Sequence, residues 1–336
     1  MTAVRRWTAA GAAAVCSVLL VVSGCSSSSP AHGGSSTTAP TAATTAAGGG
    51  ASAPPFNVTS LLHPAKKYFG VALDKVPDQL GPLDSYTAMV GKQPNLLEYY
   101  AEWGAGFDAS AVRRAWQNGS LTLMSWEPKS VSLKDIAAGK TDDYLRKYAT
   151  AVLKLNLPVV IDFADEFNGH WDNWGTQNTT PADYVAAYRH MHDVFGAVGA
   201  TNVIWAWSPN IINPVKSVKL KPYYPGDAYV DWVGLVGYFT IGTTNTFSTV
   251  FGPTIDEVRT FSSKPFIIIE TASEAGKASD VKALFTGVAG RNDFLGFIWF
   301  NYAKLADWRL QAHPAALQEF KRLATDKLFG FDARHP

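Results

Sequence analysis

A short segment, residues 158–175, holds the side chains of this chain best suited to acid–base chemistry: PVVIDFADEFNGHWDNWG. An apolar run of β-forming residues ends in three acids, Asp162, Asp165 and Glu166, and two tryptophans follow. A solvated turn after a strand would explain the acids alone. Carboxyl groups beside flat aromatic rings, however, suit the cleavage of a glycosidic bond, in which one carboxyl group protonates the leaving oxygen.

A second carboxyl group, Glu270, follows the apolar run Phe266–Ile269 in the sequence FIIIE. An uncompensated carboxylate at the end of a buried strand is costly, so its presence there indicates a function. Glycoside cleavage generally uses two carboxyl groups that flank the glycosidic oxygen, one protonated and one ionised. Glu166 and Glu270 are the pair that this chain offers.

Short β-rich runs alternate with helical stretches over the region that contains both glutamates. Helices are predicted over Asp142–Leu155, from its apolar periodicity, and over Pro181–Val198, which Thr180 caps and Pro181 opens. The predicted strands are Tyr68–Leu73, Leu96–Tyr100, Leu121–Trp126, Val159–Phe163, Val203–Trp207, Trp232–Gly237, Phe266–Ile269 and Leu295–Phe300.

Alternating strands and helices imply a parallel sheet, and eight such units in about 275 residues predict an α/β fold of the (β/α)8 (TIM) barrel type. A doubly wound open sheet is the alternative, but no GxGxxG follows the first strand and no phosphate-binding loop is present. In such a barrel the active site lies at the carboxyl ends of the strands. Glu166 ends the fourth strand and Glu270 the seventh, three units of about 31 residues apart.

Several motifs in this order resemble glycoside hydrolase family 26, whose best-known members are β-mannanases. They are EFNGHWDNWG, WSPN, YYPGDAYVDWVGLVGYF, KPFIIIETAS and IWFN followed by DWR, and they span Phe69 to Arg309. The resemblance implies a (β/α)8 barrel and a retaining mechanism, with Glu166 as acid/base and Glu270 as nucleophile. The two carboxyl groups of a retaining enzyme lie about 5–5.5 Å apart.

The resemblance also implies a set of residues around the two glutamates. Tyr238 matches the family's tyrosine near the nucleophile and would hydrogen-bond its carboxylate. Glu127 and Asn210 would position sugar hydroxyl groups. Four tryptophans offer flat faces to a pyranose ring, with plain core packing as the alternative for each: Trp171, Trp174, Trp207 and Trp299.

The chain departs from the family pattern just before the acid/base. The family usually reads RFxHE where this chain reads DFADE, so Asp162 replaces an arginine and Asp165 a histidine. Anionic neighbours would raise the pKa of Glu166 and favour its protonated form. Asp165 is therefore a further candidate for contact with the substrate, and the sugar bound there could differ from mannose. A milder departure is Thr271 after Glu270, where the family usually has glycine.

The N-terminus reads as an export signal. Arg5 and Arg6 precede an apolar run, and VSGC at its end resembles a bacterial lipobox, which implies cleavage before Cys25 and lipidation of its sulfur. An ordinary signal peptide cut nearby is the alternative. We expect a signal peptide at 1–24, a lipidated Ser/Thr/Ala/Gly/Pro-rich linker at 25–56, a catalytic domain at 57–336, and anchoring to the outer face of the cell membrane.

Three readings of function follow. The first is a retaining endo-β-glycosidase acting on β-1,4-mannan, and the second is the same machinery acting on a mixed-linkage glucan, a xylan or a cell-envelope glycan. The third is a surface lipoprotein that binds a polysaccharide or oligosaccharide without cutting it. A net charge of +1 gives no case for nucleic acid binding. Without HExxH or a cysteine in the domain we expect no catalytic metal and no cofactor, and we expect a monomer.

Overall fold

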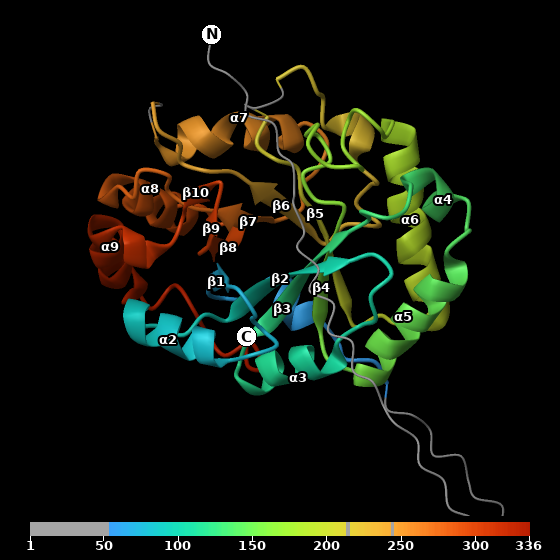
Figure 1. Ribbon diagram of the computed structural model, residues 1–336, viewed down its shortest axis with the longest axis horizontal. Coiled ribbons are helices and arrows are strands. Elements are labelled where there is room, and N and C mark those ends of the chain that lie inside the picture. Colours follow the sequence, from blue (N-terminus) through green and yellow to red (C-terminus); the bar gives the residue numbers. More distant parts are fainter. Residues whose placement is uncertain (1–53, 213–215, 243–244) are drawn as a thin grey trace, which may run out of the picture. The chain divides into compact units, whose positions relative to one another are not determined.

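The computed structural model describes residues 54–212, 216–242 and 245–336. Eight parallel strands, β1 to β8, close into a barrel in sequence order, and helices surround it (Figure 1). The predicted (β/α)8 barrel is therefore confirmed. The predicted signal peptide, Cys25 and nearly all of the predicted linker lie outside the described residues.

Every predicted strand is present, and the differences from prediction lie at the strand ends. Three strands run further at their carboxyl ends than predicted, to Glu102, Glu127 and Thr271. The first two are neighbours in the sheet, and their ends keep pairing with each other. The strands are β1 (Tyr68–Ala72), β2 (Leu96–Glu102), β3 (Leu121–Glu127), β4 (Val159–Phe163), β5 (Val203–Trp207), β6 (Trp232–Val236), β7 (Phe266–Thr271) and β8 (Phe294–Phe300).

The two predicted helices have the predicted bounds. Thr180 accepts a hydrogen bond from the backbone N–H of Asp183 at 3.2 Å, and Gly199 ends that helix in the left-handed conformation. The α-helices are α1 (Thr59–Leu62), α2 (Gly81–Val90), α3 (Ala109–Gln117), α4 (Leu133–Ala137), α5 (Asp142–Leu155), α6 (Pro181–Val198), α7 (Phe247–Arg259), α8 (Ala278–Ala289) and α9 (Pro314–Ala324). No helix in the described ranges combines the length and apolar character that crossing a bilayer would require.

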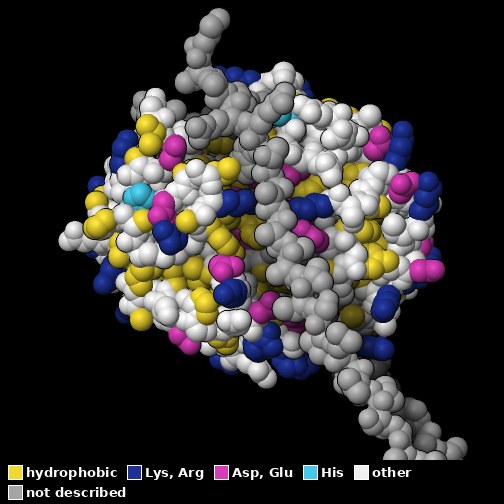
Figure 2. All heavy atoms as spheres, in the orientation of Figure 1, with side chains coloured by type: hydrophobic (Ala, Val, Ile, Leu, Met, Phe, Trp, Pro, Cys, Tyr) yellow, Lys and Arg dark blue, Asp and Glu magenta, His cyan; other side chains and the backbone are white. Residues whose placement is uncertain are grey.

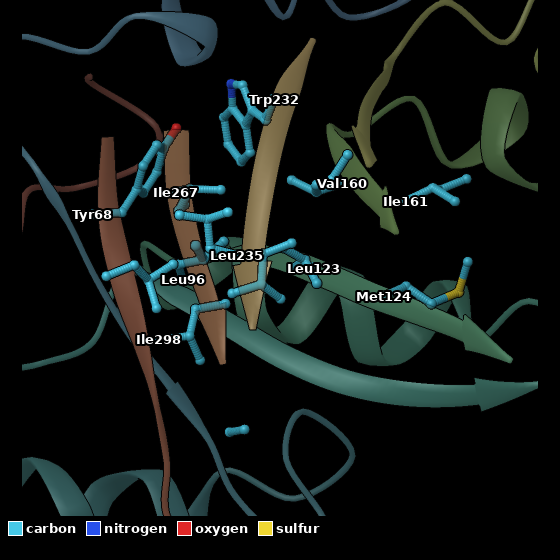
Figure 3. Packing of buried hydrophobic residues seen from close by; sticks show 14 of the residues in the cluster. Tyr68, Leu96, Leu123, Met124, Val160, Ile161, Trp232, Leu235, Ile267 and Ile298 are labelled. Carbon is cyan, nitrogen blue, oxygen red and sulfur yellow. The ribbon is translucent and has the colours of Figure 1, made fainter. Parts of the chain in front are cut away.

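Side chains from all parts of the barrel fill its interior, and Figure 3 shows Leu96, Leu123, Leu235, Ile267 and Ile298 close together. Most strands are buried along their whole length, as expected where helices cover a parallel sheet. The strand β2 differs, because it is buried at its start and increasingly exposed towards Glu102. The carboxyl ends of the strands therefore form the open, polar end of the barrel.

Register shifts within the strands and a hairpin after them shape this end. The register of β6 against β7 shifts between Leu235 and Val236, and that of β7 against β8 shifts on either side of Ile268. Such irregularities at a barrel rim re-aim the neighbouring side chains, here those around Glu270. A small hairpin of β9 (Ala303–Lys304) and β10 (Ala306–Asp307) follows β8 directly.

Candidate active site

Glu166 sits in a strained turn immediately after β4. Ala164 and Glu166 have positive φ angles of 53° and 50°, which are uncommon for residues other than glycine. Backbone hydrogen bonds hold this turn, from the Ala164 N–H to the Trp126 carbonyl at 3.1 Å and from the Glu166 N–H to the Ser208 carbonyl at 2.9 Å. Strain of this kind persists only where the surroundings enforce it, and it is concentrated at functional sites.

Asn210 fixes the side chain of Glu166. Its amide nitrogen Nδ2 donates to Glu166 Oε2 at 2.5 Å. Asn168 holds Asn210 in turn, because its Oδ1 accepts from the Asn210 backbone N–H and its Nδ2 donates to the Asn210 carbonyl, both at 2.9 Å. Asn210 therefore lies beside Glu166, with its amide directed at that carboxyl group, and its contact with a sugar hydroxyl stays a prediction.

Glu270 is the penultimate residue of the strand β7 and accepts two phenolic hydrogen bonds. The Tyr238 hydroxyl donates to Oε1, which is the contact predicted for this tyrosine. The Tyr100 hydroxyl, from β2, donates to Oε2 at 2.7 Å. Each oxygen of the carboxylate thus has a separate donor, and this arrangement favours the ionised form and fixes its orientation.

The two glutamates have raised but different pKa values. Burial and the charge of Glu270 raise the pKa of Glu166 to about 8, against the hydrogen bond from Asn210. Burial raises the pKa of Glu270 to about 7, against the hydrogen bond from Tyr100 and the positive charge of Lys304. Burial raises the pKa of both groups, and the two phenolic donors stabilise a negative charge on Glu270. Near neutral pH this leaves the proton on Glu166, the division of roles that glycoside cleavage requires.

The two aspartates that break the family pattern are both buried. Ser208 Oγ donates to the Asp162 carboxylate at 2.6 Å, and burial raises the pKa of Asp162 to about 8 against this bond. Burial and the charge of Asp162 also raise the pKa of Asp165, whose Oδ1 has no hydrogen-bond partner among the described residues. The predicted rise in the pKa of Glu166 is confirmed in sign, but its leading causes are burial and Glu270.

Three of the four tryptophans predicted to face a sugar are core residues, so those predictions are wrong. Trp174, Trp207 and Trp299 are 2%, 0% and 1% exposed. Each indole N–H donates to a backbone carbonyl, which satisfies the polar edge of the ring and allows both faces to be buried. Trp171 is partly exposed and lies over Gly169, where a Cβ would come within 2.4 Å of its ring. Its role as a sugar platform stays a prediction.

Charged residues of both signs form the rim around the two glutamates. Glu127, at the end of β3, pairs with Lys129 at 2.7 Å and remains a candidate for contact with the substrate. Burial and the charge of Glu127 raise the pKa of Asp172 to about 6, and the positive charges of Lys129 and Lys304 oppose this rise. Figure 2 shows Lys and Arg side chains interspersed with Asp and Glu on the face it presents. No three His, Cys, Asp or Glu side chains in the described ranges are grouped to hold a metal ion.

Sequence reasoning missed three residues of the site. Tyr100 contacts Glu270, and Glu98, on the same strand, is buried beside it. Trp308 packs on the Tyr238 ring with centroids 4.5 Å apart. A signal for the first two was present, because an acid in an apolar strand marks the inward face, and the residue two positions later shares that face.

Comparison with known proteins identifies the domain. Residues 131–277 match the sequence profile of Glycosyl hydrolase family 26. The chain contains a glycoside hydrolase family 26 domain. Endoglucanase H of Acetivibrio thermocellus is 30% identical over 259 residues, which are 71% of this chain and 28% of that protein. A mannan endo-1,4-beta-mannosidase of Bacillus subtilis strain 168 is 31% identical over 90 residues, 25% of this chain and 24% of that one.

A third relative, the beta-1,3-xylanase TXYA of a Vibrio species, is 24% identical over 180 residues, 50% of this chain and 38% of the xylanase. The chain thus spans less than two fifths of the length of each of these relatives. Solved family 26 structures share the fold. A modular endo-beta-1,4-mannanase from Cellulomonas fimi superposes with a TM-score of 0.64 at 18% identity, covering 82% of this chain and 74% of that one.

Proposed function

We propose that this family 26 protein is a retaining endo-β-glycosidase that hydrolyses a β-linked polysaccharide. The first candidate substrate is β-1,4-mannan. One observation carries the proposal: of two carboxyl groups at the ends of β4 and β7, one has surroundings that favour its protonated form and the other has surroundings that favour its ionised form. Burial and the charge of Glu270 favour a protonated Glu166, and the single amide donor of Asn210 opposes them only in part. Two phenolic donors favour an ionised Glu270.

The proposed mechanism is a double displacement. Glu270 attacks the anomeric carbon, the glycosidic bond breaks, and Glu166 transfers its proton to the departing oxygen. Water then attacks the anomeric carbon of the glycosyl-enzyme, Glu166 takes the proton of that water, and the bond to Glu270 breaks. The hydrogen bonds from Tyr100 and Tyr238 hold the Glu270 carboxylate in one orientation for the attack.

A β-glucan is the second candidate substrate. The similarity to a protein named endoglucanase covers 71% of this chain, whereas the similarity to the Bacillus subtilis mannosidase covers 25%. Asp162 and Asp165 also replace the arginine and histidine that are usual in the family; Asp165 directly precedes Glu166, and Asp162 lies in the strand that leads to it. Such a change beside the acid/base favours a different sugar at the point of cleavage.

The test is release of reducing sugar from a panel of polysaccharides by the purified full-length chain. The panel holds β-1,4-mannan, mixed-linkage β-glucan and β-1,3-xylan, and Glu270→Ala is the control. Release from mannan that is lost in the control supports the proposal, and release from glucan supports the second candidate. If the folded protein binds a glycan of the panel but cuts none, both hydrolase proposals fail, and the protein has a binding function instead.

We propose further that the protein is anchored to the outer face of the cell membrane by a lipid on Cys25. The basic start, the apolar run and the VSGC motif support this placement. Partition of the wild-type chain into a detergent phase, and of Cys25→Ala into the aqueous phase, is the expected result. Equal partition of the two chains would contradict the anchor.

A further inference from the structure

Trp308 is a buried aromatic residue that the double displacement does not use. It directly follows the hairpin of β9 and β10 and is 8% exposed. Its ring packs against the ring of Tyr238, with centroids 4.5 Å apart and planes inclined at 38°. In the part of the chain that the structure describes, Trp308 makes no other ring contact. Its aromatic contact therefore leads to the candidate active site and not to the other rings of the core.

Three hydrogen bonds fix Trp308 in this place. Its indole Nε1 donates to the carbonyl of Lys304 in the hairpin at 2.9 Å. Its backbone N–H donates to the Tyr302 carbonyl at 2.9 Å, and its own carbonyl accepts from Trp299 Nε1, on β8, at 3.2 Å. Backbone and side chain are thus both tied to β8 and to the segment that follows it, so the ring has one position beside Tyr238.

Tyr238 depends on its neighbours for the direction of its side chain. It lies two residues after the end of β6 and is partly exposed. The backbone beside it is held, because the Gly237 N–H donates to the Glu270 carbonyl at 3.0 Å. The ring still turns about two side-chain bonds, so what packs against it decides where its hydroxyl lies. Its ring neighbours are Trp308 and Phe300, the latter nearly perpendicular at 6.1 Å.

We propose that Trp308 is a positioning residue that holds the Tyr238 hydroxyl on the Glu270 carboxylate. This inference rests on the proposed function, in which Glu270 is the nucleophile. The carboxylate has one phenolic donor on each oxygen. Loss of the donor on Oε1 makes the charged form less favourable and leaves the attacking group less well oriented. Trp308 thus acts through Tyr238 and needs no contact with the sugar.

The matched variants are Trp308→Leu and Trp308→Phe. Leucine keeps an apolar side chain without a flat ring, so we expect kcat to fall about tenfold with KM unchanged, the effect of losing one hydrogen bond to the nucleophile. Phenylalanine keeps an aromatic face against Tyr238, and we expect its kcat to stay within about threefold of the wild type. A phenylalanine variant as slow as the leucine variant would overturn the proposal. A higher KM with unchanged kcat would also overturn it, because Trp308 would then contact the substrate itself.

Trp232→Leu is the control for a loss of fold. Trp232 is also fully buried, and its indole Nε1 also donates to a backbone carbonyl, that of Leu62 at 3.3 Å. It lies at the start of β6, the opposite end of that strand from Tyr238. We expect both leucine variants to melt at a lower temperature than the wild type, and only Trp308→Leu to lose kcat. Equal losses of kcat would show that the rate follows stability and would overturn the proposal.

A double-mutant cycle with Tyr238→Phe tests the route. Because Trp308 acts through Tyr238, adding Trp308→Leu to Tyr238→Phe should cause no further loss of kcat. Each single variant should also move the acidic limb of the kcat/KM profile to higher pH, because Glu270 loses a donor to its charged form. Additive losses, or an acidic limb that stays in place in Trp308→Leu, would refute the assigned role.

A crystal structure of Trp308→Leu gives a readout that does not need activity. We expect the Tyr238 hydroxyl to lie outside hydrogen-bond distance of Glu270 Oε1. A hydroxyl still on that oxygen would overturn the proposal whatever the kinetics. If the wild type cuts no polysaccharide but the hydroxyl moves in the variant, the proposed function fails while the positioning role of Trp308 stands. The two failures are therefore distinguishable.

Discussion

The chemistry of the site depends on which of two identical side chains holds a proton. Glu166 and Glu270 have the same intrinsic acidity, and their partners separate them. Asn210 and a neighbouring carboxylate surround the first, whereas two tyrosine hydroxyls contact the second. Their raised pKa values, about 8 and about 7, set the pH at which the pair works.

The activity should therefore follow a bell-shaped pH profile with its maximum between about pH 7 and about pH 8. Below this window Glu270 takes up a proton and loses its nucleophilicity, and above it Glu166 loses the proton that it must donate. The measurement is kcat/KM on a soluble oligosaccharide from pH 5 to pH 9. A maximum at pH 5 would contradict the protonation states assigned here.

Trp171 and Trp174 provide a matched test of exposure against burial. Trp171→Ala removes a partly exposed ring, so KM should rise about three- to tenfold while the melting temperature changes little. Trp174→Ala removes a ring that is 2% exposed, so it should cost about 3–5 kcal/mol of unfolding free energy. Kinetics and denaturant unfolding of both variants separate the two effects, and a reversed pattern would refute the assignment.

At this scale the sequence predicted the hydrogen bond of Tyr238 better than the positions of the tryptophans. The Tyr238 hydroxyl contacts Glu270 as predicted, because a polar group at the mouth of the barrel must find a partner there. Tryptophan is ambiguous, because its one donor is satisfied as well by a core carbonyl as by a sugar. Trp207 and Trp299 illustrate this, each donating to a backbone oxygen. No sequence pattern shows which side of the ring is filled.

At the scale of the elements, β6 and β7 pack so closely at Gly234 that no side-chain atom fits there. A Cβ at Gly234 would lie 2.2 Å from Ile269 Cδ1 and 2.7 Å from Ser208 Cβ. Gly234→Ala should therefore force β6 and β7 apart and lower the unfolding free energy by about 1–3 kcal/mol. The same shift moves Glu270, the residue after Ile269, so kcat should fall as well. Gly242→Ala, with open space at its Cβ but a positive φ, is a control for backbone strain alone.

Element bounds followed the sequence wherever a local signal marks an end. The helix α6 begins after Thr180 because that hydroxyl caps it and ends before Gly199 because glycine adopts the left-handed conformation. The register shift after Leu235 and the left-handed Ala164 have no such signal. Both are imposed by contacts between strands far apart in the sequence, so local patterns cannot predict them.

For the whole molecule, the cluster of buried acids should make stability depend on pH. The pKa values of Asp162 and Glu270 rise from 3.8 and 4.5 to about 8 and about 7 on folding. Between about pH 4 and about pH 8 the folded protein thus holds more protons than the unfolded chain, and the unfolding free energy falls as pH rises. We expect the melting temperature at pH 8 to lie at least about 2 °C below that at pH 5.

Calorimetry across this range checks the expectation. Asp162→Asn, which removes one titrating group, should give a shallower dependence than the wild type. A melting temperature that is flat or rises from pH 5 to pH 8 would show that these acids are ionised in the folded protein.

Closure of the barrel has a consequence for how the chain is made. The strand β1 (Tyr68–Ala72) pairs with β2 on one side and with β8 (Phe294–Phe300) on the other. Its second partner therefore leaves the ribosome only after all the other strands of the barrel. Joining ends so distant in the sequence carries a large loop-closure cost and slows folding. The nascent chain must remain open along one edge until Phe300 has emerged, and it needs protection from association with other chains for that time.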